Sequence, residues 1–261
     1  MSKIAILGAG VYGTALGGVL ARNGYDIDYY DPLKEKERLK DVMAGAKAAV
    51  LVVPSATAIK LLPHIPKDIF LVVATKGFLS ETPFLDFRKW GVLSGAGFAK
   101  DFNSGKDLCL TATDEKILEL FKSAHLKFDF TTDRLGVLMC GALKNVYALL
   151  AGRLGLKPGT KKMYDYILAA SNEMGMILKQ NGASIRTLRL SCGVKDLILT
   201  CSPNSRNYSF GLELKEGSMK DPESTVEGLT TLKRIKRGEI NLPGSVNLLN
   251  QLLEDFDATE R

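Results

Sequence analysis

The chain has few of the side chains that most often carry metal chemistry or acid–base chemistry. It contains two histidines, His64 and His125, and neither has a second candidate ligand at metal-ligand spacing. We therefore expect both histidines to lie at the surface or in turns, and we expect no metal site. Because a histidine acid or base is poorly supported, a lysine becomes the better candidate for any proton transfer.

Cysteine and long apolar runs are scarce as well. The four cysteines, Cys109, Cys140, Cys192 and Cys201, form no Cys-x-x-Cys pair, which argues against a zinc site and a disulfide scaffold. We expect them to be reduced core residues. No apolar run reaches the length that spans a bilayer, and strand-like residues begin at Lys3, leaving no room for a cleavable signal. These features predict a cytoplasmic protein without membrane insertion.

Positive charge is only slightly in excess of negative charge. The 261 residues carry a net charge of +6, and lysine and arginine are dense only in "KEKERLK" and "LKRIKR". Such short runs are typical of solvated helix faces, so we expect no nucleic-acid partner, whereas a small anionic ligand suits a mildly basic protein. The apolar content of 46% indicates a folded globular chain, and its length suits two modest domains.

The first 31 residues carry the strongest local signal. A β-branched run, a glycine turn, a helix-compatible stretch and a second strand-like run predict a βαβ unit. Gly8, Gly10 and Gly13 form a G-x-G-x-x-G turn, in which missing Cβ atoms let the backbone approach a pyrophosphate at a helix N-terminus. Asp31 closes the second strand, where its carboxylate can accept hydrogen bonds from ribose hydroxyls.

The same aspartate bears on the choice of cofactor. A carboxylate at this position would repel the 2′-phosphate of NADP, so we expect NAD to be preferred, with NADP possible. Three cations follow Asp31 closely and can approach the 2′-phosphate of NADP: Lys34, Lys36 and Arg38. We expect direct contact with Asp31 to outweigh these solvent-screened side chains.

Further along, two kinds of periodicity divide the chain. Strand-like runs at 47–55, 68–77, 90–99, 107–114 and 126–133 predict a doubly wound sheet, and long helical periods begin at Arg134. The expected fold class is α/β. It comprises an N-terminal Rossmann dinucleotide-binding domain over residues 1–132 and an all-helical substrate-binding and catalytic domain over residues 133–261.

Lys144 and Asn145 lie side by side in the apolar segment "GALKNVYALLAGRLGL". A helix start with the ammonium reaching solvent is the ordinary reason for such a pair. Lys76, however, follows the carboxyl end of a strand, where open α/β sheets bind ligands. Two lysines near a carboxylate and an Arg-Asn pair favour a phosphorylated carbonyl substrate, because arginine offers a fork of donors to phosphate and a desolvated lysine near another cation suits proton transfer. The segment "KDLILTCSPNSRN" supplies the remaining polar candidates: Asp196, Thr200, Ser205, Arg206 and Asn207.

At these residues the sequence resembles the NAD(P)-dependent glycerol-3-phosphate dehydrogenases. The resemblance runs through "GAGVYGTAL", "VPS", "ATKG", "LSGAGFAKD", "GALKNVYALLAGRLGL", "DLILTCSPNSRN" and "VEGLTT", and the combination of "GALKNV" with "DLILTC" and "SRN" is its most specific part. It implies an oxidoreductase that interconverts dihydroxyacetone phosphate and sn-glycerol 3-phosphate by hydride transfer. It also implies a supply of product to glycerophospholipid synthesis, and a homodimer.

The resemblance implies roles for individual residues. Lys144 is the general acid/base, and Lys76 and Asp196 complete the catalytic set. The substrate-binding set draws on both halves of the chain: Lys76, Gly95, Lys144, Asn145, Asp196, Thr200, Ser205, Arg206 and Asn207. The cofactor-binding set begins in the glycine turn: Gly8, Gly10, Val11, Tyr12, Gly13, Asp31, Lys76, Ala99, Arg206 and Glu227.

Three departures from the family's pattern keep other interpretations open. Ala96 and Gly97 stand where a Pro-Ser pair is usual, Lys195 replaces a glycine, and the span after Asp31 is short, which implies the loss of a helix and a strand beside the adenosine. A non-catalytic dinucleotide-binding protein is one alternative. A β-hydroxyacid dehydrogenase is another alternative. Those enzymes carry a Lys-x-x-x-Asn spacing, however, and the position four residues after Lys144 is Ala148 here.

Overall fold

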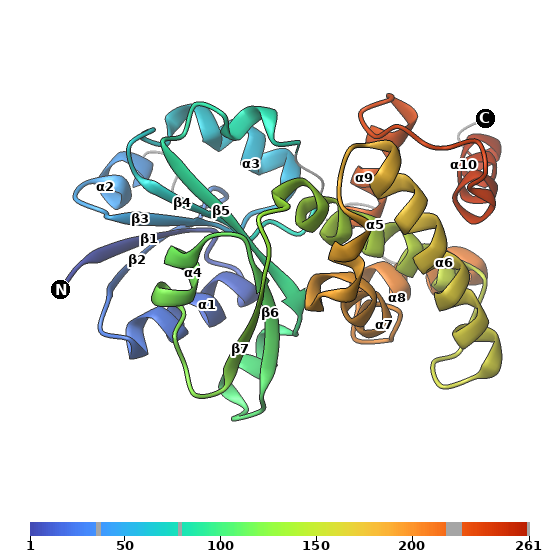
Figure 1. The fold of residues 1–261 in the computed structure, drawn as a ribbon, viewed down its shortest axis with the longest axis horizontal. Coiled ribbons are helices and arrows are strands. Elements are labelled where there is room, and N and C mark those ends of the chain that lie inside the picture. The colour runs from blue at the N-terminus through green and yellow to red at the C-terminus, as the bar shows by residue number, and fades with distance from the viewer. Residues whose placement is uncertain (35–37, 78–79, 218–225, 260–261) are drawn as a thin grey trace. The chain divides into compact units, whose positions relative to one another are not determined.

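A computed structural model describes residues 1–34, 38–77, 80–217 and 226–259 (Figure 1). The chain divides into two compact units, Met1–Arg134 and Leu135–Arg261. The first unit holds the sheet, and the second unit is helical in all of its described elements. The expected fold class is therefore confirmed.

The first unit is built on one seven-stranded sheet in the part of the chain that the structure describes, in the order β2-β1-β3-β4-β5-β6-β7. Its middle strands are apolar and buried along their whole length, because helices cover the sheet on both sides: α1 and α4 on one, α2 and α3 on the other (Figure 1). The strands are β1 Lys3–Leu7, β2 Asp26–Tyr30, β3 Ala48–Leu51, β4 Phe70–Val73, β5 Lys89–Ala96, β6 Leu108–Ala112 and β7 Leu126–Phe130. The helices are α1 Val11–Arg22, α2 Leu39–Met43, α3 Ser55–Leu61 and α4 Glu115–Leu120.

The sheet is doubly wound about β1. The chain leaves β1 for β2 on one side and then crosses to β3 on the other side of β1. The strand order therefore reverses at β1, and the loop after β1 lies at the switch point where open α/β sheets bind their ligands. This loop is the glycine-rich turn that leads into α1.

One pair of strands departs from the parallel arrangement. β5 and β6 pair antiparallel, whereas all other neighbouring strands of the sheet are parallel. Residues 97–107 join β5 to β6 and contain only a short 3-10 helix, η4 (Ala99–Asn103). A parallel connection needs about a dozen residues or more, usually including a helix, so this link is too short to cross over the sheet.

The second unit consists of helices around a buried central one. The helices are α5 Arg134–Arg153, α6 Lys161–Gln180, α7 Asp196–Thr200, α8 Arg206–Glu216, α9 Glu227–Lys236 and α10 Asn247–Thr259. A 3-10 turn, η5 (Ile185–Arg189), and a kinked segment, η6 (Ser191–Lys195), lead into α7. Every residue of α5 from Gly136 to Gly152 is buried, so the apolar circumference seen in the sequence reflects a core helix.

The expectation that no segment is long and apolar enough to span a bilayer was wrong. Helix α5 is long and apolar enough to cross a membrane by length and composition. Lys144 interrupts its apolar run, but the helix as a whole stays apolar. However, 94% of its apolar window is buried inside the protein. Buried core helices often have the same length and composition, so this helix is weak evidence for a membrane span.

Candidate active site

The glycine turn after β1 combines tight packing with one open position. Gly8 has a φ of +129°, and a Cβ on Gly13 would lie 1.9 Å from the Gly8 carbonyl oxygen, so neither position accepts a side chain. A Cβ at Gly10, by contrast, would meet nothing within 4 Å. Gly10 is the N-cap of α1, and as a glycine it has no side chain to cover the helix N-terminus. The backbone here is therefore open to a ligand and suits the pyrophosphate of a dinucleotide.

Lys76 lies beside this turn. Its Nζ atom is 4.1 Å from the centroid of the Tyr12 ring, and the Tyr12 ring meets Phe102 edge to face with a centroid distance of 5.6 Å. A cation over an aromatic face is attracted by the ring quadrupole. The structure thus brings together two residues of the predicted cofactor-binding set, Tyr12 and Lys76, whereas neighbouring Val11 is exposed.

Asp31 lies directly after β2, as predicted, and its carboxylate already has two partners. It accepts a hydrogen bond from the backbone N–H of Leu33 at 3.1 Å and forms an ion pair with Lys34 at 3.5 Å. Arg38 forms an ion pair with Asp28 at 3.0 Å. Lys36 lies outside the described residues. Two of the three nearby cations are therefore bound to carboxylates.

Gly95 and Ala99 lie near the end of β5. Gly95 has a φ of +145°, and a Cβ there would lie 2.9 Å from the Cα of Leu110 on the antiparallel partner strand. Ala99 is the first residue of η4 and is half-buried. Gly95 therefore accepts no side chain, because its backbone lies against the antiparallel partner strand.

In the second unit, Lys144 of α5 forms an ion pair with Asp196 of α7. The side chains are 6% and 3% exposed. Thr200 donates a hydrogen bond from Oγ1 to the backbone carbonyl of Asp196 at 2.6 Å, and the same Oγ1 is 3.5 Å from an Asp196 carboxylate oxygen. Lys144 is therefore not a solvent-reaching residue at a helix start. Two charges this deeply buried persist because each neutralises the other.

A local irregularity places Asp196 at this position. The segment η6 precedes α7 and is kinked at Gly193, where φ is −92° and ψ is −120°, outside the helical range. A Cβ on Gly193 would lie 2.2 Å from the Leu188 carbonyl oxygen, so only glycine lets the chain fold this closely. Lys195 is exposed although Asp196 beside it is buried, so the unusual lysine at this position adds no bulk to the buried pair.

A second polar cluster surrounds Asn145. Its Nδ2 atom donates to the Gly141 carbonyl at 3.0 Å, and its Oδ1 atom accepts from Asn207 Nδ2 at 3.0 Å. Asn207 Oδ1 in turn accepts from the backbone N–H of Gly228 at 2.9 Å. The cluster thus joins α5, α8 and the first turn of α9, where Glu227 is the first residue.

Ser205 and Arg206 begin α8. Ser205 is the buried N-cap residue and makes no side-chain cap hydrogen bond within the described part of the chain, while Arg206 is exposed. Helix α8 is pressed against α5, because a Cβ on Gly211 would lie 2.1 Å from the Leu149 carbonyl oxygen and one on Gly152 would lie 2.0 Å from the Tyr208 carbonyl oxygen. The close contact of α5 with α8 at these two glycines fixes the distance from Lys144 and Asn145 to the start of α8.

The sequence reasoning missed a buried carboxylate in α6. Glu173 accepts hydrogen bonds from the backbone N–H groups of Asn247 and Leu248, both at 2.7 Å, and from the Tyr147 hydroxyl at 2.9 Å. It therefore caps α10 and links that helix to α5. Burial, followed by the Glu173 charge, raises the pKa of Tyr147 well above its ordinary value. The missed signal is that Glu173 occupies the apolar stripe of α6 at helical spacing.

The cysteines are reduced, as expected, and three of them are fully buried. Cys140, Cys192 and Cys201 lie in the core, whereas Cys109 is half-buried. Burial raises the pKa of the Cys201 thiol to about 12. Because the thiolate is the reactive form, Cys201 is an inert core residue despite its position next to Thr200.

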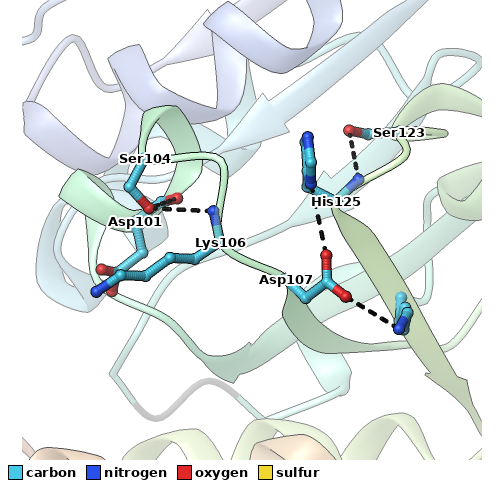
Figure 2. A network of polar contacts seen from close by, with 7 residues as sticks. Asp101, Ser104, Lys106, Asp107, Ser123 and His125 are labelled. Atoms are coloured by element: carbon cyan, nitrogen blue, oxygen red, sulfur yellow. Dashed lines mark hydrogen bonds and ion pairs between the residues drawn. The ribbon is translucent and has the colours of Figure 1, made fainter.

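The histidines lie at the surface. His64 is exposed in a short 3-10 turn, and His125 is exposed in the network shown in Figure 2. There, Asp107 forms an ion pair with Lys127 at 3.0 Å and approaches His125 Nδ1 at 3.5 Å. Lys127, and then His125, lower the pKa of Asp107. The described residues contain no group of three or more metal-ligating side chains.

The sheet with its open glycine turn and the helical unit with its buried lysine–aspartate pair define a two-domain dehydrogenase of the Rossmann class. Residues 133–252 match the family described as NAD-dependent glycerol-3-phosphate dehydrogenase C-terminus. The glycerol-3-phosphate dehydrogenase [NAD(P)+] of Yersinia pestis (strain Pestoides F) is 31% identical over 288 residues, covering 90% of this chain and 85% of the relative. This chain belongs to the NAD(P)-dependent glycerol-3-phosphate dehydrogenase family.

Two further comparisons extend over nearly the whole chain. The glycerol-3-phosphate dehydrogenase [NAD(P)+] of Leptospira biflexa is 29% identical over 308 residues, covering 99% of this chain and 91% of the relative. The crystal structure of glycerol-3-phosphate dehydrogenase from Coxiella burnetii is similar with a TM-score of 0.80 and 25% identity, covering 99% and 97% of the two chains. The 308 aligned residues exceed the 261 of this chain, so the Leptospira relative has internal segments without a counterpart here.

Proposed function

We propose that this protein interconverts dihydroxyacetone phosphate and sn-glycerol 3-phosphate with a nicotinamide cofactor, and that Lys144 is the general acid/base. The observation that carries the proposal is the buried ion pair of Lys144 with Asp196 on an otherwise apolar core helix. A buried charge pair is costly to keep for stability alone, because apolar residues of similar volume often serve as well. Its retention in a chain of this family favours a role in the chemistry.

Lys144 would move the proton at the substrate's C2 oxygen. In the reduction, Lys144 Nζ donates a proton to this oxygen as negative charge develops on it, and in the oxidation it removes that proton. Asp196 holds the ammonium in place, and Thr200 holds Asp196 through the hydrogen bond to its carbonyl. Lys76 adds a positive charge that favours the developing oxyanion. When bound, the nicotinamide supplies or accepts the hydride.

The first unit would hold most of the cofactor. The open backbone at Gly10 and the N-terminus of α1 suit a pyrophosphate, and Asp31 suits the ribose hydroxyls. The other proposed contacts are assigned by resemblance to the family: Gly8, Val11, Tyr12, Gly13, Lys76, Ala99, Arg206 and Glu227.

The start of α8 would hold the substrate's phosphate. Helix N-termini attract anions through their N–H groups and their dipole, and Arg206 lies exposed at the first position of this helix. Ser205 is the residue that precedes it. The remaining proposed substrate contacts are Lys76, Gly95, Lys144, Asn145, Asp196, Thr200 and Asn207.

An assay of NADH oxidation with dihydroxyacetone phosphate tests the activity directly. The wild-type chain should turn over, and Lys144→Ala should fold but lose about 10²–10⁴-fold in kcat, the usual contribution of a general acid/base. Lys161→Ala is a matched control, because Lys161 pairs with Asp165 at 2.7 Å on an exposed helix face. NADH binding without turnover by the wild type would instead identify a non-catalytic dinucleotide-binding protein.

Cofactor preference has its own test. We expect a higher kcat/KM with NADH than with NADPH in the wild type, and a shift toward NADPH in Asp31→Ser, because that variant removes the charge that repels a 2′-phosphate. The ion pair of Asp31 with Lys34 makes the preference modest, since Lys34 partly neutralises the carboxylate. A wild-type preference for NADPH would show that Asp31 does not determine the choice.

The biological setting follows from the family resemblance. We place the enzyme in the cytoplasm as a homodimer that binds a phosphorylated small molecule, without nucleic acid or membrane insertion, and that feeds glycerophospholipid synthesis. Light scattering of the purified chain tests the dimer, since a monomer mass at assay concentrations contradicts it.

A further inference from the structure

The start of α9 is attached to α5 through the side chain of one residue. Asn207, on α8, donates from Nδ2 to the Asn145 side chain of α5 and accepts at Oδ1 from the backbone N–H of Gly228 on α9. Both asparagines are buried, with 8% and 3% of their surface exposed. The Asn145 amide donates to the Gly141 carbonyl. The three hydrogen bonds therefore agree on which atom of each asparagine amide is the nitrogen and which is the oxygen.

Backbone packing supports the same connection independently. A Cβ on Gly228 would lie 2.7 Å from the Asn145 carbonyl oxygen and 2.9 Å from Asn207 Oδ1. The first turn of α9 therefore rests directly on α5, at the residue that follows Lys144 in the chain. Only a residue without a side chain permits this approach.

We propose that Asn207 is a positioning residue: it fixes the first turn of α9, and with it Glu227, to the part of α5 that carries Lys144. The inference rests on the proposed function, in which Glu227 contacts the cofactor and Lys144 moves the proton. An asparagine amide has two donor hydrogens and one acceptor oxygen, and the two bonds of Asn207 use the oxygen and one hydrogen. The second hydrogen stays available for the proposed substrate contact, so the positioning role adds an effect on cofactor binding through α9.

The test measures the NADH dissociation constant without substrate, the KM for dihydroxyacetone phosphate, and amide hydrogen exchange in the first turn of α9. Asn207→Ala removes both hydrogen bonds. Asn207→Asp keeps the acceptor for the Gly228 N–H and loses the donor to Asn145. Gly228→Ala keeps the Asn207 side chain in the sequence but pushes α9 away from α5, because the added Cβ would lie 2.7 Å from the Asn145 carbonyl oxygen.

A matched control comes from another asparagine of the second unit. Asn181 bridges two segments in a similar way, donating to the Ile177 and Asn241 carbonyls at 2.8 Å and accepting from the Asn241 N–H at 2.9 Å. It belongs to neither the catalytic set nor the binding sets. Asn181→Ala should therefore leave NADH affinity and α9 exchange unchanged.

We expect the NADH dissociation constant to rise roughly tenfold in Asn207→Ala, the usual effect of losing a buried hydrogen bond, and to rise in Gly228→Ala as well. Asn207→Asp should raise it at least as much as Asn207→Ala, because it buries a carboxylate whose oxygen faces the Asn145 Oδ1 atom, and α9 exchange should quicken in the order of the rises. A residue that only contacts the substrate's phosphate behaves differently: Asn207→Asp and Asn207→Ala would then raise the substrate KM and leave the NADH dissociation constant unchanged.

Unchanged NADH affinity in both Asn207→Ala and Gly228→Ala overturns the inference, as does an equal loss of affinity in Asn181→Ala. Those results leave the proposed function standing if the wild type turns over. Failure of the wild type to oxidise NADH with dihydroxyacetone phosphate refutes the proposed function itself, so the two failures are distinguishable.

Discussion

Removing the charge of Asp196 while keeping its shape should weaken the second unit severely. In Asp196→Asn the ammonium of Lys144, which is 6% exposed, loses its counter-charge without gaining access to water. Breaking a buried ion pair in this way costs about 3–5 kcal/mol. Since domains are stable by only about 5–15 kcal/mol, a large share of the stability of this unit is lost.

The loss is best measured by urea unfolding, because urea does not screen charges as guanidinium chloride does. Far-ultraviolet circular dichroism is dominated by the longer helices of the second unit, whereas fluorescence of the single tryptophan, Trp90, reports on the first unit. We expect the circular dichroism transition of Asp196→Asn to move to lower urea while the Trp90 transition changes less. Asp165→Asn, in the exposed pair with Lys161, should cost no more than about 0.5 kcal/mol.

A double-mutant cycle isolates the pair itself. Lys144→Met leaves a buried carboxylate, and Asp196→Asn leaves a buried ammonium, but the double variant leaves neither charge unpaired. The double variant should therefore be more stable than the sum of the two single losses predicts, by about 1 kcal/mol or more. Strictly additive losses, or a cost below about 1 kcal/mol for Asp196→Asn, would refute the reasoning, because solvated charges behave in that way.

Three further predictions concern the core of the second unit and the thiols. Gly211→Ala should lower stability by about 1–3 kcal/mol in thermal melts, because its Cβ would lie 2.1 Å from the Leu149 carbonyl oxygen, whereas Gly244→Ala, with nothing within 4 Å, should not. Stability should fall as the pH rises above 10.0, the ordinary tyrosine pKa, because Tyr147 keeps its proton in the folded chain while the unfolded chain loses it; Tyr147→Phe should reduce that slope in pH-dependent unfolding. A thiol reagent should label half-buried Cys109 first and the three buried cysteines only on unfolding, as a time course of labelling would show.

The βαβ start and the long helices were predictable because their signals are local. β1, the glycine turn and α1 follow from residue types in consecutive positions, and so does the change to helical periods at Arg134. The antiparallel pairing of β5 with β6 was not predicted. It depends on the length and path of the link through η4, which residue composition does not reveal.

For the candidate site, the sequence alone supplied the candidate residues, because Lys144 stands out on an apolar helix and family motifs accompany it. Only the tertiary structure decided the partners. Lys144 meets Asp196 across 52 positions, and Asn207 meets Asn145 across 62. Glu173 caps a helix that begins 74 residues later. Such pairings arise where helices cross, and their geometry depends on close contacts such as that of Gly211 with α5, which no local pattern encodes.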